Sequence, residues 1–169
     1  MIHLYYGDGK GKTTSAMGLA LRCAGNGGRV RLFQFLKDNS SCERVALENI
    51  KNIELICGRE CEKFVFDMTA EEKAEVSEFY VKMLGKLFED IEQYDMIILD
   101  EAGTAVECGI ITEKELIEKI RMHKNDTEIV ITGGRVSQEL TDVCDYVTHM
   151  QKIKHPFDKG VVARKGVEF

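Results

Sequence analysis

The segment Gly7-Asp8-Gly9-Lys10-Gly11-Lys12-Thr13-Thr14 combines three glycines, two lysines and two hydroxyl side chains within eight residues. Glycines allow successive backbone N–H groups to turn toward a polyphosphate, and a helix that begins here adds the positive end of its dipole. Lys12 would add a full positive charge, and the Thr13 hydroxyl is a ligand suited to Mg²⁺. The segment therefore predicts a phosphate-binding loop, with a glycine-rich turn and a solvated lysine as the alternative.

The residues around this loop predict the elements that position it. The apolar run 2–6 is typical of a strand, and residues 15–21 are typical of a helix. The loop departs from the usual G-x-x-x-x-G-K-[ST] pattern, because Tyr6 occupies the first glycine position and the spacing from Gly7 is one residue short.

A second motif places carboxylates at the end of a strand. Four apolar residues, 96–99, precede Asp100 and Glu101. Such a run fits a strand buried on both faces, with the carboxylates at its ligand-bearing end. An acidic residue at this place can hold Mg²⁺ opposite the loop hydroxyl, directly or through water. Taken alone, the Asp-Glu pair also fits a solvated strand end.

Elsewhere the chain alternates between strand and helix patterns, with no linker or repeat. Two capping boxes, 69–72 and 112–115, each open an amphipathic helix, and the apolar spacing of the first helix continues to Ile91. Further strands are predicted at 29–36, 52–56, 128–132 and 145–148. This alternation predicts an α/β fold in a single domain, residues 1–169, with a mostly parallel sheet, helices on both faces and ligands at the carboxyl ends of the strands.

Composition argues against two classes of partner, nucleic acid and membrane. The 169 residues carry a net charge of −6, which argues against binding to nucleic acid. No apolar stretch has membrane-spanning length, and Met1 leads directly into a strand, so a cytoplasmic protein without a membrane partner is expected. The six cysteines are then expected as thiols, and Cys57 with Cys61 is half of a metal site at most.

The order of the motifs resembles that of the P-loop type ATP:corrinoid adenosyltransferases along nearly the whole chain. Besides the phosphate-binding loop and its short spacing, the resemblance is carried by Gly18–Arg22, Gln34–Lys37, Leu99–Glu101, Ile131–Gly133 and the closing segment Lys154–Phe169.

This resemblance implies a transferase that moves the 5′-deoxyadenosyl group of ATP to Co(I) of a reduced corrinoid and releases inorganic triphosphate, in adenosylcobalamin biosynthesis or salvage. Lys12, Thr13 and Glu101 are the expected catalytic residues, since they would neutralise charge on the departing triphosphate. Mg²⁺ or Mn²⁺ is expected on Thr13, on Glu101 and, through water, on Asp100. The expected ATP-binding residues are Gly7, Asp8, Gly9, Lys10, Gly11, Lys12, Thr13, Thr14 and Arg22, although Arg22 also fits an ordinary helix surface.

The resemblance also implies a corrinoid site that helps to form Co(I). Segment 62–68 is similar to the family's aromatic corrinoid loop, with phenylalanine at position 66, where the family often has tryptophan; two aromatic residues that anchor a loop to the core are the alternative. The expected corrinoid-binding residues are Phe64, Phe66, Asp67, Met68, His155 and Phe157. No flavin or iron–sulfur motif is present, so electrons would come from a flavodoxin-like protein or reduced flavin. A second subunit, as in a homodimer, would supply any lid.

Departures from the family pattern and two other functions stay open. Arg135 falls one place after the family's arginine, and His149 stands where glutamate is common, with a surface position as its simpler interpretation. The first alternative function is a P-loop ATPase or phosphotransferase with Glu101 as the activating group. The second is a nucleotide-dependent corrinoid carrier without turnover.

Overall fold

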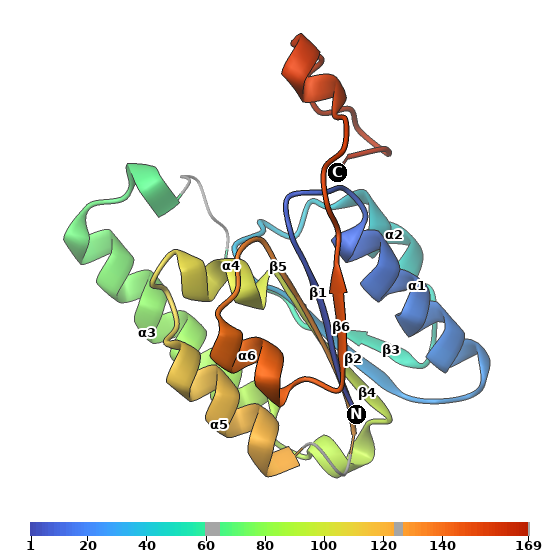
Figure 1. Ribbon diagram of the computed structural model, residues 1–169. Coiled ribbons are helices and arrows are strands. Elements are labelled where there is room, and N and C mark those ends of the chain that lie inside the picture. The colour runs from blue at the N-terminus through green and yellow to red at the C-terminus, as the bar shows by residue number, and fades with distance from the viewer. Residues whose placement is uncertain (60–64, 124–126, 169) are drawn as a thin grey trace.

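This computed structural model describes residues 1–59, 65–123 and 127–168, and the side chain of Phe66 is not described. The described residues form one sheet of six parallel strands, in the order β3-β2-β4-β5-β1-β6 (Figure 1). The strands are β1 (Ile2–Tyr6), β2 (Val30–Gln34), β3 (Ile53–Leu55), β4 (Met96–Asp100), β5 (Glu128–Gly133) and β6 (Tyr146–His149). Every pairing is parallel. For example, Ile131 of β5 lies opposite Leu4 of β1 on one side and opposite Leu99 of β4 on the other. The predicted α/β fold is therefore confirmed.

Helices cover both faces of the sheet, and each face has its own apolar core. On one face, α1 (Lys12–Gly25) and α2 (Cys42–Leu47) pack on side chains such as Ile98 and Val130. On the other face, Ile97 and Ile131 meet the remaining helices of the described part of the chain. These helices are α3 (Ala70–Leu87), α4 (Ala102–Glu107), α5 (Glu113–His123) and α6 (Gln138–Val143). Because side chains alternate along a strand, β4 supplies both cores, and all five of its residues are buried.

The capping boxes begin two of these helices as predicted. The Thr69 hydroxyl accepts a hydrogen bond from the Glu72 amide, and the Glu72 carboxylate accepts one from the Thr69 amide. Helix α3 ends at Leu87, so the prediction that one helix extends to Ile91 is wrong. Asp90 has a φ of 51°, which breaks the helix, and Ile91 lies in a separate 3-10 turn, η2 (Ile91–Gln93). Its side chain still packs in the same core.

Strand β2 is shorter than the sequence pattern predicts. The predicted run reached residue 36, whereas the strand ends at Gln34. Leu36 has a φ of 57°, a left-handed conformation that an extended strand does not accommodate. The backbone therefore turns at this point and carries Lys37 toward the end of β4 and the start of α1.

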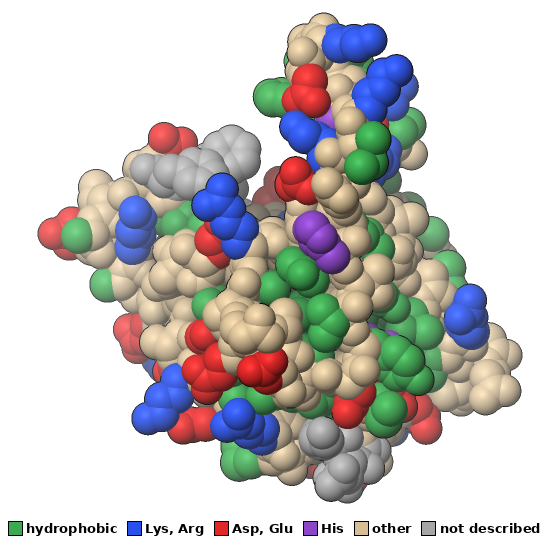
Figure 2. Space-filling model, viewed as in Figure 1, with side chains coloured by type: hydrophobic (Ala, Val, Ile, Leu, Met, Phe, Trp, Pro, Cys, Tyr) green, Lys and Arg blue, Asp and Glu red, His purple; other side chains and the backbone are tan. Residues whose placement is uncertain are grey.

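The carboxy-terminal tail, residues 150–168, leaves β6 and stands away from the body before it returns toward the loop between β1 and α1 (Figure 1). Its outermost part contains η3 (Pro156–Lys159), and Figure 2 shows lysine and arginine side chains on this projection. Phe157 and Val162 of the tail are exposed. No helix in the described part of the chain is long and apolar enough to cross a membrane.

Candidate functional site

The loop between β1 and α1, residues 7–14, is held from two sides by backbone hydrogen bonds. The Gly7 amide donates to the Gly134 carbonyl at 2.9 Å, and the Gly9 amide donates to the Met150 carbonyl at 2.7 Å. A Cβ on Gly9 would lie 2.6 Å from the Met150 carbonyl oxygen, so only glycine fits there. Because protein carbonyls take these two amides, the loop amides expected to face a phosphate are those nearer the start of α1.

The two loop lysines point to different partners. The Lys12 ammonium donates to the Gly9 carbonyl at 2.8 Å and so folds back over the loop. The Lys10 ammonium lies 3.0 Å from Glu168 at the end of the tail. Gly11, with a φ of 109°, turns the chain so that α1 begins at Lys12. Both positive charges therefore lie at the amino end of α1, where its dipole also favours an anion.

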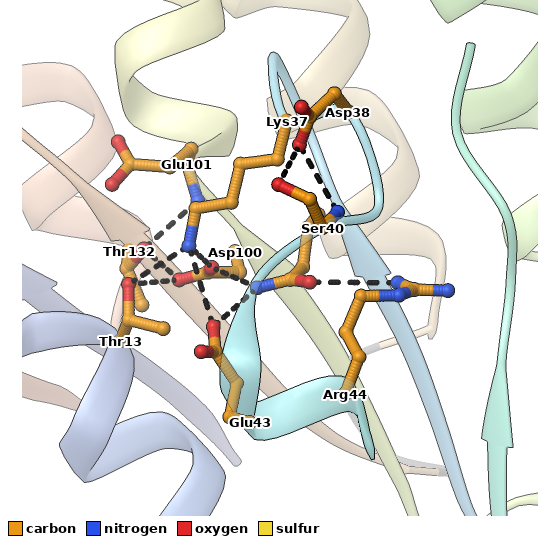
Figure 3. Close-up of polar contacts among 10 residues, drawn as sticks. Thr13, Lys37, Asp38, Ser40, Glu43, Arg44, Asp100, Glu101 and Thr132 are labelled. Atoms are coloured by element: carbon orange, nitrogen blue, oxygen red, sulfur yellow. Dashed lines mark hydrogen bonds and ion pairs between the residues drawn. The ribbon is translucent and has the colours of Figure 1, made fainter. Parts of the chain in front are cut away.

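A buried carboxylate joins the loop to the ends of β4 and β5 (Figure 3). Asp100 is fully buried. Its Oδ1 accepts hydrogen bonds from the Thr13 hydroxyl at 2.9 Å and the Thr132 hydroxyl at 2.7 Å. Helix α1 begins beside these strand ends, and this explains how Thr13, 87 positions away in sequence, reaches Asp100.

The other oxygen of Asp100 faces β2 and the segment after it. Asp100 Oδ2 accepts from Lys37 Nζ at 2.7 Å and from Gln34 Nε2 at 3.1 Å. The Gln34 amide also donates to Glu43 at 2.9 Å, and its oxygen accepts from the buried Arg44 at 3.4 Å. Gln34 of β2 and Lys37 of the segment after it thus contact the Asp100 carboxylate directly, while Glu43 and Arg44 of α2 contact Gln34.

Glu101 has a different environment from Asp100. It has a φ of 61°, and its amide donates to the Thr132 hydroxyl at 2.8 Å. Its carboxylate accepts from the Thr104 hydroxyl at 2.5 Å and points away from Asp100 in Figure 3. Asp100, rather than Glu101, is thus the carboxylate in direct contact with Thr13.

A cavity of about 940 Å³ opens beside these residues. Its polar side includes Thr13, Thr14, Lys37 and Glu101. Its other side is mainly apolar and comes from α1, the segment after β2, and α3 with the turn before it: Met17, Leu36, Val65, Met68 and Val76. The volume falls within the roughly 300–1,000 Å³ usual for ligand sites. One cavity thus combines hydroxyl and charged groups with an apolar wall.

The oxygen groups at this site suit Mg²⁺ that arrives with a polyphosphate. The Thr13 hydroxyl and Asp100 carboxylate are already adjacent, and Glu101 lines the same cavity. Among the described residues, no group of three or more His, Cys, Asp or Glu side chains is arranged to hold a metal ion. Mg²⁺ commonly uses one or two carboxylates together with substrate phosphates and water, so this donor set fits Mg²⁺.

Several predicted residues lie away from the cavity. Arg22 is exposed in the last turn of α1, ten residues after Lys12, which corresponds to about 15 Å along a helix. His155 and Phe157 lie at η3 in the projecting tail, where the Phe157 amide donates to His155 Nδ1. The Arg135 side chain is 93% exposed beside Glu107, and His149 is exposed, as its simpler interpretation expected.

The predicted corrinoid loop is only partly described. Met68 lines the cavity, and the exposed Asp67 ends the 3-10 turn η1 (Val65–Asp67). Phe64 and the Phe66 side chain lie outside the described residues, so the aromatic wedge stays a prediction.

The tail closes one side of the cavity through its last described residues. Gly166, Val167 and Glu168 line the cavity. The Arg164 side chain and amide bind the Glu168 carboxylate, Lys10 adds a further hydrogen bond, and together they lower the pKa of Glu168 to about 2. Earlier in the tail, the Lys152 amide donates to Asp8 and lowers the pKa of that carboxyl. Two carboxylates therefore tie the tail to the loop.

Removing the Glu168 charge is expected to destabilise the protein near neutral pH, with an effect that fades in acid. The pKa of Glu168 falls from a usual 4.5 to about 2 on folding. The ionised carboxylate therefore contributes its full stabilisation of the folded protein at pH values well above 4.5, and this stabilisation is lost as the pH falls toward 2. Melting temperatures of wild type and Glu168→Gln, measured across pH, should differ by a constant amount above about pH 5 and converge below it. A difference that does not change with pH would contradict this assignment.

Sequence reasoning missed part of the polar network. Gln34 and Lys37 were noted only within a family motif, and neither Thr104 nor Thr132 was assigned a role. The position of Lys37 just beyond a strand was a usable signal, since ligands gather at the carboxyl ends of parallel strands. The pairing of Lys37 with Asp100 depends on β2 lying next to β4 in the sheet. The spacing of apolar residues along the sequence does not show which strands are neighbours.

The parallel sheet, the glycine loop between β1 and α1, and the aspartate at the end of β4 are consistent with a P-loop-type α/β fold. The model of the ATP:corrinoid adenosyltransferase family BtuR/CobO/CobP matches residues 1–169, and the chain belongs to this family. The predicted family is thus confirmed.

Individual relatives agree with this membership. Over 172 residues the chain is 29% identical to the corrinoid adenosyltransferase CobA of Salmonella typhimurium, an alignment that covers 100% of this chain and 85% of the Salmonella protein. It is 31% identical to a corrinoid adenosyltransferase of Sinorhizobium sp., covering 96% of this chain and 77% of that protein. A corrinoid adenosyltransferase of Pseudomonas aeruginosa is 29% identical, and the alignment covers 98% of this chain and 82% of the Pseudomonas protein.

Proposed function

We propose that this protein transfers the 5′-deoxyadenosyl group of ATP to Co(I) of a reduced corrinoid. In this reaction the Co(I) electron pair attacks C5′, a carbon–cobalt bond forms, the C5′–O bond breaks, and inorganic triphosphate leaves with that oxygen. Family membership over the full chain supports this function. The observation that carries it is the single cavity, in which phosphate-loop hydroxyls face a largely apolar wall.

The charged groups at the amino end of α1 have a defined task in this reaction. Negative charge grows on the triphosphate as the C5′–O bond breaks, and donors fixed in advance stabilise it without reorganisation. Lys12 and Lys10 lie where they could turn from Gly9 and Glu168 to the triphosphate. Mg²⁺, when bound, would neutralise triphosphate charge at Thr13 and Asp100, with Glu101 as a further ligand. The attack itself needs no general base from the protein.

The apolar wall is the proposed place for the corrinoid and the nucleoside. Met68 and Val76 approach from the α3 side and Leu36 from the segment after β2. Exclusion of water here would protect Co(I) and strengthen the charge interactions at the triphosphate. The electrons that form Co(I) are proposed to come from an external flavodoxin-like protein or reduced flavin, and a second subunit is the proposed source of a lid.

The two other functions are not favoured. A phosphotransferase or ATPase needs a group that activates water or an acceptor, yet the Glu101 carboxylate is bonded to Thr104 and turned from Asp100. A nucleotide-dependent carrier would use the same lysines and hydroxyls at the amino end of α1 to bind its nucleotide, so these groups do not separate a carrier from a transferase. The relatives, however, are named as adenosyltransferases.

Product analysis with chemically prepared Co(I) corrinoid and Mg²⁺–ATP separates the three functions. We expect an adenosylated corrinoid and inorganic triphosphate in equal amounts. ADP with phosphate would instead indicate a phosphotransferase or ATPase. Corrinoid binding with neither product would indicate a carrier.

Glu101→Gln is expected to raise the Mg²⁺ concentration needed for half-maximal transfer, because an amide is a weaker ligand than a carboxylate for this cation. Mg²⁺ titration at saturating ATP measures this shift. Glu107→Gln is the matched control, because Glu107 pairs with the exposed Arg135 and is not among the residues that line the cavity; this variant should titrate as wild type does. An unchanged titration for Glu101→Gln would leave Glu101 as a partner of Thr104 only.

A further inference from the structure

Three side-chain oxygens from different elements surround the Lys37 ammonium (Figure 3). Its Nζ lies 2.7 Å from Asp100 Oδ2, 3.5 Å from the Thr13 hydroxyl and 3.7 Å from Glu43 Oε1. Oxygen ligands of this kind, around a position beside the phosphate loop, are also those that a divalent cation prefers. A protein cation therefore occupies the space next to the proposed metal ligands.

Burial of Asp100 explains why a cation is needed there. The residue is fully buried, and a buried ionised carboxylate is costly without a compensating charge. The hydroxyls of Thr13 and Thr132 donate hydrogen bonds but carry no charge. Lys37 supplies the positive charge directly, and its side chain remains 24% exposed toward the cavity.

We propose that Lys37 is an internal counterion that stands in for Mg²⁺ in the nucleotide-free protein and leaves Asp100 when Mg²⁺ binds with ATP. This inference rests on the proposed Mg²⁺–ATP site. Two cations within reach of the same Asp100 oxygen repel one another, so the metal and the ammonium compete for it. The displaced ammonium stays at the cavity wall, where it faces the polyphosphate.

The backbone on either side of Lys37 is suited to such a change. Leu36 has a φ of 57° and Asn39 a φ of 67°, so two non-glycine residues within four positions adopt the left-handed conformation. Strain of this kind persists only where surrounding contacts impose it, and it is often found in segments that switch. The Tyr80 hydroxyl accepts from the Leu36 amide at 3.0 Å, and Asn39 exchanges hydrogen bonds with Gly58. These contacts hold both ends while the Lys37 side chain remains at the cavity.

Mn²⁺ binding without nucleotide or corrinoid tests the proposal directly. Free Mn²⁺ can be counted by electron paramagnetic resonance in titrations of wild type, Lys37→Met and Lys51→Met. Loss of the competing ammonium should make Lys37→Met bind Mn²⁺ about tenfold more tightly or better than wild type. Lys51→Met, which removes an exposed lysine in the turn before β3, should bind as wild type does. Equal affinity in all three proteins would overturn the proposal.

The coupling to Asp100 provides a second test. In an Asp100→Asn background, Lys37→Met should leave Mn²⁺ affinity almost unchanged, since the shared carboxylate charge has gone. If Lys37→Met raised Mn²⁺ affinity as much in the Asp100→Asn background as in the wild-type background, Lys37 would act at a site other than Asp100, and the proposal would be contradicted. Neither titration involves turnover, so a protein that shows competition for Mn²⁺ but forms no adenosylated corrinoid would contradict only the proposed function.

A measurement on the wild-type protein avoids dependence on a variant's folding. The ¹⁵N signal of the Lys37 ammonium, assigned by its loss in Lys37→Arg, should be visible in the ion-paired state. Addition of Mg²⁺–ATP should shift or remove this signal, whereas ATP with a chelator should not. A Lys37 signal unchanged by Mg²⁺–ATP would refute displacement.

Discussion

Lys12→Ala is expected to lower the rate of adenosyl transfer at least about tenfold, corresponding to about 1.4 kcal/mol or more of transition-state stabilisation. Lys12 lies at the amino end of α1, where the departing triphosphate would carry its growing charge. A single-turnover reaction between Mg²⁺–ATP and chemically prepared Co(I) corrinoid measures this step without the contribution of reduction.

Two comparisons separate charge from folding. Lys12 donates to the Gly9 carbonyl, so the alanine variant also loses a contact within the loop, and its melting temperature must be measured. Lys10→Ala removes the same charge from the same loop, but Lys10 is exposed and pairs with Glu168, so a smaller loss of rate is expected. Near-normal transfer by a stably folded Lys12→Ala protein would refute the phosphate-loop assignment.

Gly133→Ala is expected to lower the free energy of unfolding by about 1–3 kcal/mol, because it forces extra volume into a closely packed contact. A Cβ at Gly133 would lie 2.6 Å from the Gly103 Cα and 2.9 Å from the Gly103 carbonyl carbon. These are backbone atoms of α4, so no side chain can rotate away. Since the preceding Thr132 binds Asp100, Mg²⁺-dependent activity should fall as well. Chemical denaturation measures the stability change.

Gly85→Ala is the matched control for this substitution. Gly85 lies inside α3, and a Cβ there would meet nothing within 4 Å. Alanine is favoured over glycine in a helix interior, so this variant should gain up to about 1 kcal/mol. Equal destabilisation by both variants would indicate that the contact between β5 and α4 is not the cause.

The fold was largely predictable because its signals are local. The buried run ending at Asp100 predicted β4, and the capping boxes at Thr69 and Thr112 predicted the starts of two helices. The short helices α2, α4 and α6 were not predicted, since six residues give too few turns for an apolar period to appear. Their positions depend on packing against the sheet.

Site residues that belong to one continuous sequence motif were predictable. Contacts between side chains of different segments were less so. Thr13 and Asp100 were expected at one metal site, and the structure brings them into contact. The direct contact of Asp100 with Thr13, and the turn of Glu101 toward Thr104, depend on the backbone at the end of β4. Lys37 enters only because β2 lies next to β4 and the chain turns sharply at Leu36.

The most direct test of the proposed reaction follows the oxygen that joins C5′ to the α-phosphorus of ATP. With oxygen-18 at this bridge and chemically prepared Co(I) corrinoid, attack at C5′ leaves the label in inorganic triphosphate, which mass spectrometry can detect. We predict that the triphosphate carries the label and that the adenosylated corrinoid does not. Label recovered in ADP would show cleavage at phosphorus and would contradict adenosyl transfer as the function of this protein.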